Sequence, residues 1–333
     1  MKYRWLAVVS VVVLVITFGG GLLALRGWYR ASLQPPAGSS EQTVLLRIEP
    51  GMSSADVAYQ LKKHQLIRSR FSWRWYVFSQ GLSIKLQAGL YSLHGGLSVP
   101  EIADIMSKGD TQAITVTLTS GMRLSQIKAL LEEKGFEHRD IEEALSRRYE
   151  HSILADKPAS ASLEGYLFAD TYRLELDRPI IELVDLMIAN SDQKITPKIR
   201  QAWASEGLDL HQGLTLASIV QKEVANEADQ KQVAQVFLKR LQIGMKLEAD
   251  PTFEYAAALL GVPANIHVDS PFNTYVKKGI PPTPIATIEL SAAEAVAFPA
   301  DTNWLYFLSD RDGVTHFTES ETEHNQNIEK YLR

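Results

Sequence analysis

The sequence predicts an α+β protein in which a single amino-terminal transmembrane helix carries two folded parts. Three observations support this fold class. The chain begins with an uncharged apolar run at residues 5–25, a strand-and-helix pattern over residues 43–110 indicates a small unit, and residues 111–333 continue with a larger mixture of helices and short strands. A chain of 333 residues is long enough for two modest domains beyond a membrane segment.

The run from Trp5 to Leu25 has the length and character of a membrane span. It contains no charged side chain and would cross a hydrocarbon layer of roughly 30 Å as a helix. Trp28 and Tyr29 follow it at a position typical of interfacial aromatic residues. The basic head at residues 1–4 is very short, which favours a cytoplasmic amino terminus and an exported body. A cleaved signal peptide is the alternative, but the run is long for one and no clean cleavage motif follows it.

Residues 26–42 are predicted as a linker and residues 43–110 as a small β-α-α-β-α unit. The end of the linker is rich in proline, glycine and serine, as flexible tethers are. In the second helix of the unit, Phe71, Trp75 and Phe78 recur at helical spacing, so we expect this stripe to be core and Trp73 to be exposed. The elements expected are a strand at 43–48, a helix from Ser53 or Ser54 through Lys63, the aromatic helix, a strand at 86–93 and a helix from Ser98 to Gly109.

Residues 111–333 are predicted to contain several helices, a long loop-rich stretch and a terminal hairpin. Proline, glycine and asparagine recur from Asp250 to Ile285, which indicates structured loops, and such loops commonly have functional roles. Trp304 to Leu308 and the segment around His316 are expected to pair as a hairpin before a final helix. The earlier elements expected are a strand at 114–118 and helices at 125–134, 138–149, 180–190, 197–206, 214–228 and 231–242.

Glu223 is the most informative ionisable residue of this part. If residues 214–228 form one helix, Glu223 lies on the same face as the apolar Ile219 and Val220. Burial would raise the pKa of this carboxyl, which suits a group that donates a proton near neutral pH. A non-functional interpretation remains open, in which Glu223 borders the apolar stripe and its flexible side chain reaches water.

Composition and missing motifs exclude several other chemistries. A formal charge of −5 argues against nucleic acid as the main partner, and the lack of cysteine excludes disulfides and thiolate chemistry. The eight histidines are scattered, so no metal site is expected, and no serine-hydrolase, P-loop or dinucleotide motif occurs. Carboxylate chemistry at Glu223 remains. A glycosidase would pair it with a second carboxylate, and the candidates are Glu164, Asp170, Glu227 and Asp250.

Five ordered segments resemble motifs of the YceG-like endolytic murein transglycosylases. They are LEGYLFADTY at 163–172, LASIVQKE at 216–223, ADPT at 249–252, FNTY at 272–275 and GIPPTPI at 279–285. The sequence departs from the family pattern at Gln221, where many members carry an acid, and at Phe272, where tyrosine is usual. The first departure leaves Glu223 as the only glutamate of its motif. The second puts any essential role of a hydroxyl at position 272 in doubt.

The resemblance implies a fold, an activity and a location. Residues 43–110 would be a LysM-like subdomain and 111–333 the YceG-like catalytic domain, on the outer face of a bacterial cytoplasmic membrane. Glu223 would cleave the β-1,4 bond between N-acetylmuramic acid and N-acetylglucosamine of nascent peptidoglycan strands without water or any cofactor, and peptidoglycan synthases would be candidate partners. The substrate-binding residues implied are Glu164, Tyr166, Asp170, Tyr172, Asp250, Thr252, Asn273 and Tyr275.

Two other functions remain open at this point. The protein could be a muramidase that hydrolyses the same bond with water. It could also be a non-catalytic peptidoglycan-binding scaffold of the cell-wall synthesis machinery, with the LysM-like unit as the binding element. Fold and resemblance alone do not separate these possibilities, because function depends on the site.

Overall fold

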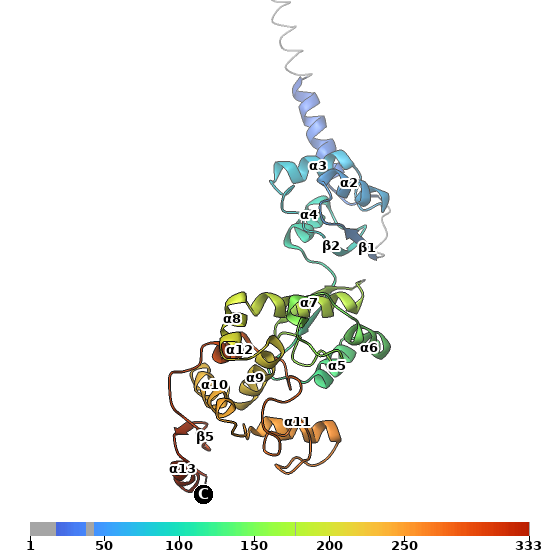
Figure 1. Ribbon diagram of the computed structural model, residues 1–333. Coiled ribbons are helices and arrows are strands. Elements are labelled where there is room, and N and C mark those ends of the chain that lie inside the picture. The colour runs from blue at the N-terminus through green and yellow to red at the C-terminus, as the bar shows by residue number, and fades with distance from the viewer. Residues whose placement is uncertain (1–17, 38–42, 177, 333) are drawn as a thin grey trace, which may run out of the picture. The chain divides into compact units, whose positions relative to one another are not determined.

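The computed structural model in Figure 1 describes residues 18–37, 43–176 and 178–332. The chain divides into two compact units. The first comprises the chain up to Ile114 together with Glu175–Asp177, and the second comprises Thr115–Leu174 and Arg178–Arg333. Helices alternate irregularly with short two-stranded sheets in this structure, so the predicted α+β class is confirmed.

The predicted membrane span falls mostly outside the described residues. A helix covers residues 18–32, and it therefore includes only the end of the predicted 5–25 segment. Among the described residues, no helix combines the length and the apolar character that crossing a membrane requires. The membrane anchor stays a prediction.

The first unit has the predicted succession of strand, two helices, strand and helix. Strands β1 and β2 pair antiparallel, with Thr43 opposite His94. Ser53 and Ser98 begin their helices with capping boxes: each hydroxyl accepts a hydrogen bond from the backbone N–H of the third helical residue, and the carboxylate of that residue accepts one from the backbone N–H of the serine. The bounds are β1 (Thr43–Ile48), α2 (Ser54–Lys63), α3 (Arg70–Ser79), β2 (Gly89–His94) and α4 (Val99–Lys108).

The prediction for the aromatic helix α3 is wrong. Phe71, Trp75 and Phe78 are 64%, 51% and 70% exposed, whereas Trp73 is fully buried with Val77 in the core of the unit. Helical spacing identifies residues that share a face, but both faces of α3 carry aromatic side chains. The packing of α3 against α2 and α4 decides which face is buried, and that packing is not encoded in the local pattern.

The second unit packs its helices around α9, α10 and α12, which contact one another (Figure 1). Strands β5 and β6 form the predicted antiparallel hairpin, with Tyr306 opposite Thr318. The elements in chain order are β3 (Ala113–Thr117), α5 (Leu124–Glu133), α6 (His138–Ser146), β4 (Thr171–Glu175), α7 (Ile180–Lys194), α8 (Pro197–Ser205), α9 (Leu210–Glu223), α10 (Glu227–Gln242), α11 (Asp250–Leu260), α12 (Leu290–Ala297), β5 (Tyr306–Ser309), β6 (Thr315–Thr318) and α13 (Glu321–Tyr331).

The helix predicted over residues 214–228 is in fact two helices. Helix α9 ends at Glu223, and Val224 adopts an extended backbone with φ −141°. Asn226 then caps α10 by accepting a hydrogen bond from the backbone N–H of Ala228 at 2.8 Å. The break places Glu223 at a helix end, where its side chain can face a cavity.

Helix α11 lies where the sequence indicated loops. Pro251 occupies the first turn of this helix, where its missing N–H costs no hydrogen bond, and three consecutive alanines favour the helix that follows. The proline at the start was therefore misread as a loop signal. Gly261 ends the helix in the left-handed conformation, φ +65°.

Close packing against α8 fixes the position of helix α9. Trp203 of α8 is fully buried, and its indole N–H donates to the carbonyl of Ala293 in α12 at 3.2 Å. Gly213 lies beneath this ring, and a β-carbon on it would come 2.2 Å from Cε3 of Trp203. The absent side chain of Gly213 therefore lets α8 and α9 approach.

We expect Gly213→Ala to destabilise the protein although alanine is the better helix former. The added methyl group overpacks a tight contact, which costs about 1–3 kcal/mol, more than the helix-propensity gain of about 1 kcal/mol. Chemical denaturation measures the change, with Gln201→Ala on the exposed face of α8 as a control expected to stay near wild type. A Gly213→Ala variant as stable as wild type would contradict this packing.

Candidate active site

Glu223 lines a cleft of about 670 Å³ in the second unit. The cleft is bordered by the end of α9, by α10, by the start of α11 and by the carboxy-terminal elements β5 and α13. Most of its polar lining comes from charged and aromatic side chains, namely Arg240, Glu248, Asp250, Glu254, Tyr275, Tyr306 and His324. Several acidic groups and one buried cation therefore share this cavity.

The Glu223 carboxyl is held in an unusually poor environment for a negative charge. Its residue is half-buried, and its Oε2 atom is buried without a hydrogen-bond partner among the described residues. The pKa of Glu223 is raised from 4.5 to about 8, chiefly by burial and also by the negative charges of Asp250 and Glu254, while Arg240 acts in the opposite direction. Glu223 is thus mainly protonated at neutral pH. The buried environment of this carboxyl excludes the non-functional interpretation, in which Glu223 is a freely solvated side chain.

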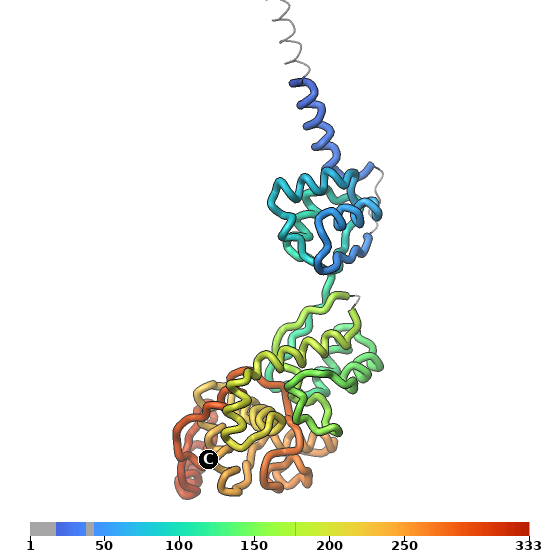
Figure 2. Tube along the Cα trace, turned by 45° about the horizontal axis from the view of Figure 1, so that its top comes forward, coloured from blue at the N-terminus to red at the C-terminus, as the bar shows by residue number. Residues whose placement is uncertain are grey.

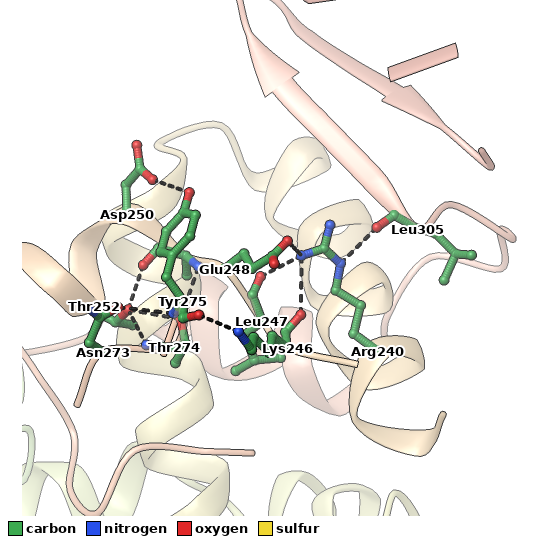
Figure 3. A network of polar contacts seen from close by, with 11 residues as sticks. Arg240, Lys246, Leu247, Glu248, Asp250, Thr252, Asn273, Thr274, Tyr275 and Leu305 are labelled. Carbon is green, nitrogen blue, oxygen red and sulfur yellow. Dashed lines mark hydrogen bonds and ion pairs between the residues drawn. The ribbon is translucent and has the colours of Figure 1, made fainter. Parts of the chain in front are cut away.

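Arg240 does not neutralise Glu223, because protein carbonyls occupy its guanidinium. The side chain is only 5% exposed, and it donates to the carbonyls of Leu305 at 2.8 Å and Leu247 at 2.7 Å. It also forms an ion pair with Glu248 at 3.5 Å. Figure 3 shows these contacts of Arg240, which join α10 to the segment before α11 and to the residue that precedes β5. Arg240 therefore braces two walls of the cleft.

The loop that carries Tyr275 is attached to the start of α11. The Tyr275 hydroxyl donates to Oδ1 of Asp250 at 2.6 Å, and Lys246 donates to the carbonyl of Tyr275 at 2.7 Å (Figure 3). Glu248, between them, has φ +51°, a left-handed conformation that is uncommon for a residue other than glycine. Such backbone strain is typical of functional loops that their surroundings hold in place.

Two of the predicted binding residues, Asp250 and Tyr275, line the cleft with Glu223, whereas Thr252 and Asn273 lie behind it. Thr252 is fully buried and bonds to the hydroxyl of Thr274 at 2.8 Å. Asn273 is also fully buried, and its amide donates to the carbonyls of Ile266 and Val268. These contacts hold the loop that positions Tyr275.

The four predicted binding residues of the 163–172 segment lie away from the cleft and form hydrogen bonds within the chain. Glu164 is 4% exposed and accepts from the backbone N–H of Leu124 at 2.8 Å and from Tyr255 at 3.1 Å, and burial raises its pKa to about 7. The others bond as follows: Tyr166 to His211, Tyr172 to the carbonyl of Phe168, and Asp170 to Asn190. None of the four lines the cleft of Glu223.

The sequence analysis missed several residues of the cleft. Glu254 follows Asp250 by one helical turn of α11, so recognition of that helix would have placed both carboxyls on one face. Tyr306 and His324 come from β5 and α13, and their rings stack at 5.3 Å between centroids. No local pattern connects these two residues with Glu223, which precedes them by about 80 and about 100 positions.

A second cavity, of about 600 Å³, lies at the opposite end of α9. Its lining includes Asp209, His211 and residues 279–282. His211 is already bonded on both ring nitrogens, to Tyr166 at 2.7 Å and to the carbonyl of Pro282 at 2.8 Å. The cleft of Glu223 is the stronger candidate, because it alone of the two presents a buried carboxyl oxygen without a partner in the described chain.

Neither cavity contains a metal-ligand cluster, since the described residues include no group of three His, Asp or Glu side chains that could hold an ion.

Comparison with known proteins identifies the family. The model of the YceG-like family matches residues 46–330. The chain belongs to the YceG-like family. A crystal structure of a YceG-like protein from Listeria monocytogenes superimposes with a TM-score of 0.56 at 27% identity, over 86% of this chain and 99% of that one. Two curated relatives of this chain are named for an enzymatic activity.

Both of these relatives are endolytic murein transglycosylases. The Bacillus subtilis protein is 32% identical over 95% of this chain and 91% of its own length. The Streptococcus pneumoniae protein is 27% identical over 90% of this chain, and the chain spans 60% of its length. The motifs that suggested the family in the sequence are therefore part of a similarity that extends along nearly the whole chain.

We expect Glu223→Gln to stabilise the protein increasingly as the pH rises. Because the pKa of Glu223 is higher in the folded state, the proton bound to this carboxyl contributes to the stability of the folded protein. This contribution is complete below pH 4.5 and is lost as the pH rises toward about 8. Glutamine has the same shape but carries no charge, so the variant avoids this loss. Melting temperatures of the two proteins should agree near pH 4 and diverge between pH 5 and 9. Equal melting temperatures at both ends would contradict the desolvated environment.

Proposed function

We propose that this protein is a membrane-anchored lytic transglycosylase. Its reaction would cleave the β-1,4 bond between N-acetylmuramic acid and N-acetylglucosamine within peptidoglycan strands and leave 1,6-anhydro ends. One observation supports this proposal above others: the Glu223 carboxyl, with one buried oxygen that has no hydrogen-bond partner among the described residues, lines an acidic cleft in a chain related to endolytic murein transglycosylases. Cleavage within nascent strands would limit their elongation.

In the proposed reaction Glu223 acts first as an acid and then as a base. Its proton passes to the glycosidic oxygen while the bond from that oxygen to C1 of the muramic acid breaks. The hydroxyl on C6 of the same sugar then attacks C1, and its proton returns to the Glu223 carboxylate. Water is not consumed, and atoms balance between the strand and its two products. Because the nucleophile is already tethered to the substrate, much of the entropic cost of the attack is avoided.

The acidic groups beside Glu223 have a complementary role in this proposal. Positive charge develops at C1 as the glycosidic bond breaks. Asp250 and Glu254 line the same cleft, and their negative charges both keep Glu223 protonated and favour that developing charge. Tyr275, which donates to Asp250 at 2.6 Å, would fix the orientation of this carboxylate. The buried Thr252 and Asn273 would support the loop from behind.

The anchor and the small unit complete the proposal. The uncharged segment at residues 5–25 supports a single-pass anchor with the amino terminus in the cytoplasm and the catalytic unit on the outer, periplasmic side. The β-α-α-β-α order of residues 43–110 supports a LysM-like unit that binds glycan strands. A position at the membrane would bring the cleft near newly made strands and their synthases, which are candidate partners.

We expect Glu223→Gln to reduce cleavage of uncross-linked glycan strands by about 10²- to 10⁴-fold, the usual contribution of a general acid and base. The matched control is Glu227→Gln: this glutamate was a candidate partner carboxylate from the sequence, but it is exposed at the start of α10 and does not line the cleft, so the rate should stay near wild type. Mass spectrometry of the products should find 1,6-anhydro ends in the wild-type digest.

Three results of this experiment would contradict the proposal. Products heavier by one water, with reducing ends, would identify a hydrolytic muramidase. An undiminished rate in purified Glu223→Gln would exclude Glu223 as the acid, and no cleavage by the wild-type protein would favour a glycan-binding scaffold.

The cleavage rate should also fall at alkaline pH. The first step needs protonated Glu223, whose pKa is about 8, so kcat/KM should decline above this pH with the loss of one proton. A rate profile between pH 5 and 10 on the same strands provides the measurement. A profile that declines already above pH 5 would mean that the reactive carboxyl has an ordinary pKa.

A further inference from the structure

The helix at residues 18–32 is fixed to the first unit, although its end falls within residues 26–42, which were predicted to be a linker. Ser32 is 6% exposed, and its hydroxyl bonds to that of Ser72 in α3 at 2.6 Å. The carbonyl of Leu33 accepts a hydrogen bond from Val99 in α4 at 2.9 Å, and Leu33 packs against the core of the unit. The helix therefore continues into the unit without a flexible joint (Figures 1 and 2).

The exposed side chains of α3 continue the apolar surface of that helix. Trp28 contacts Phe71 with 6.5 Å between ring centroids, and Trp75 contacts Phe78 at 6.1 Å. Leu22, Leu23 and Leu25 line a groove together with Trp28, Phe71 and Trp75. Large apolar patches are rarely exposed on a soluble protein unless something covers them. We call Phe71, Trp75 and Phe78 the aromatic face of α3.

The distance along the helix brings this face close to a membrane surface. The uncharged run ends at Leu25, and Trp28 lies only three residues later, about 4.5 Å along the helix axis. The headgroup layer on each side of a bilayer is about 5–8 Å thick. Phe71, in contact with Trp28, would therefore lie within the headgroup layer of any bilayer that the segment enters.

The charges around the aromatic face also fit a lipid surface. Residues 66–88 contain Arg68, Arg70, Arg74 and Lys85 and no acidic residue. Aromatic side chains flanked by basic ones are typical of the interface of membranes that contain anionic phospholipids. A glycan strand is the rival occupant, since sugars stack on aromatic rings, but it would not account for the continuity with residues 22–28.

We infer that the aromatic face of α3 lies in the headgroup layer of an anionic phospholipid bilayer and holds residues 43–110 against the membrane. This inference rests on the proposed membrane anchor. It adds that the first unit has a fixed orientation at the membrane surface, with Arg70 and Arg74 directed to lipid phosphates. The distance between the small unit and the membrane is then set by α3 rather than by a flexible tether.

The lack of cysteine in the chain allows a direct test. The variants Trp75→Cys and Phe78→Cys of the full chain are each labelled with an environment-sensitive fluorophore. The labelled proteins are reconstituted in vesicles of phosphatidylcholine and phosphatidylglycerol, with or without a lipid that bears a quencher near its headgroup. The matched control is Leu45→Cys, a 58% exposed position on β1, which lies away from the 18–32 helix (Figure 1). All three positions are exposed, so the variants should fold as the wild type does.

We expect strong quenching at positions 75 and 78 and little at position 45. Protein that floats with the vesicles but shows no quenching at positions 75 and 78 would overturn the inference and leave the anchor intact. Protein that does not float would overturn both. Fluorophores that are shielded by added glycan strands, and not by lipid, would assign the aromatic face to glycan. Cleavage by the same samples reports separately on the enzymatic proposal.

Discussion

The site depends on the cost of burying the carboxyl of Glu223. Helix α9 passes through the core and ends at this residue, so a rigid element carries the carboxyl to the cleft. One of its oxygens has no partner in the described structure, and two of the other acids that line the cleft, Asp250 and Glu254, act on it by repulsion. Burial and repulsion both favour the neutral form. The protein therefore spends stability at this position to obtain a carboxylic acid that remains protonated near neutral pH.

The surrounding network prevents relief of that cost. Arg240 is the buried cation of the cleft, but backbone carbonyls and Glu248 engage its guanidinium. A direct pair between Arg240 and Glu223 would stabilise the carboxylate and lower its pKa. The same contacts of Arg240 fix the segment before α11, which brings Asp250 and Tyr275 to the cleft. One arginine thus shapes the site while leaving its acid neutral.

Local sequence patterns predicted the small unit well and the site only in part. Capping residues such as Ser53 and Ser98 marked helix starts because capping is a local interaction. The buried face of α3 was misassigned because both of its faces are aromatic, and α11 was missed because Pro251 was read as a loop signal. Glu223 could be singled out from periodicity and family motifs. Arg240, Tyr306 and His324 could not, since only tertiary packing brings their elements together.

The ionisation of Glu223 is the central quantity of the proposed chemistry, and it can be observed directly. The carboxyl ¹³C resonance of Glu223, assigned by its absence in Glu223→Gln, can be followed through a pH titration of the full chain. We predict a midpoint near 8, as expected for a desolvated carboxyl beside Asp250 and Glu254. A midpoint near 4.5, the ordinary value of glutamate, would contradict a neutral acid poised for proton transfer.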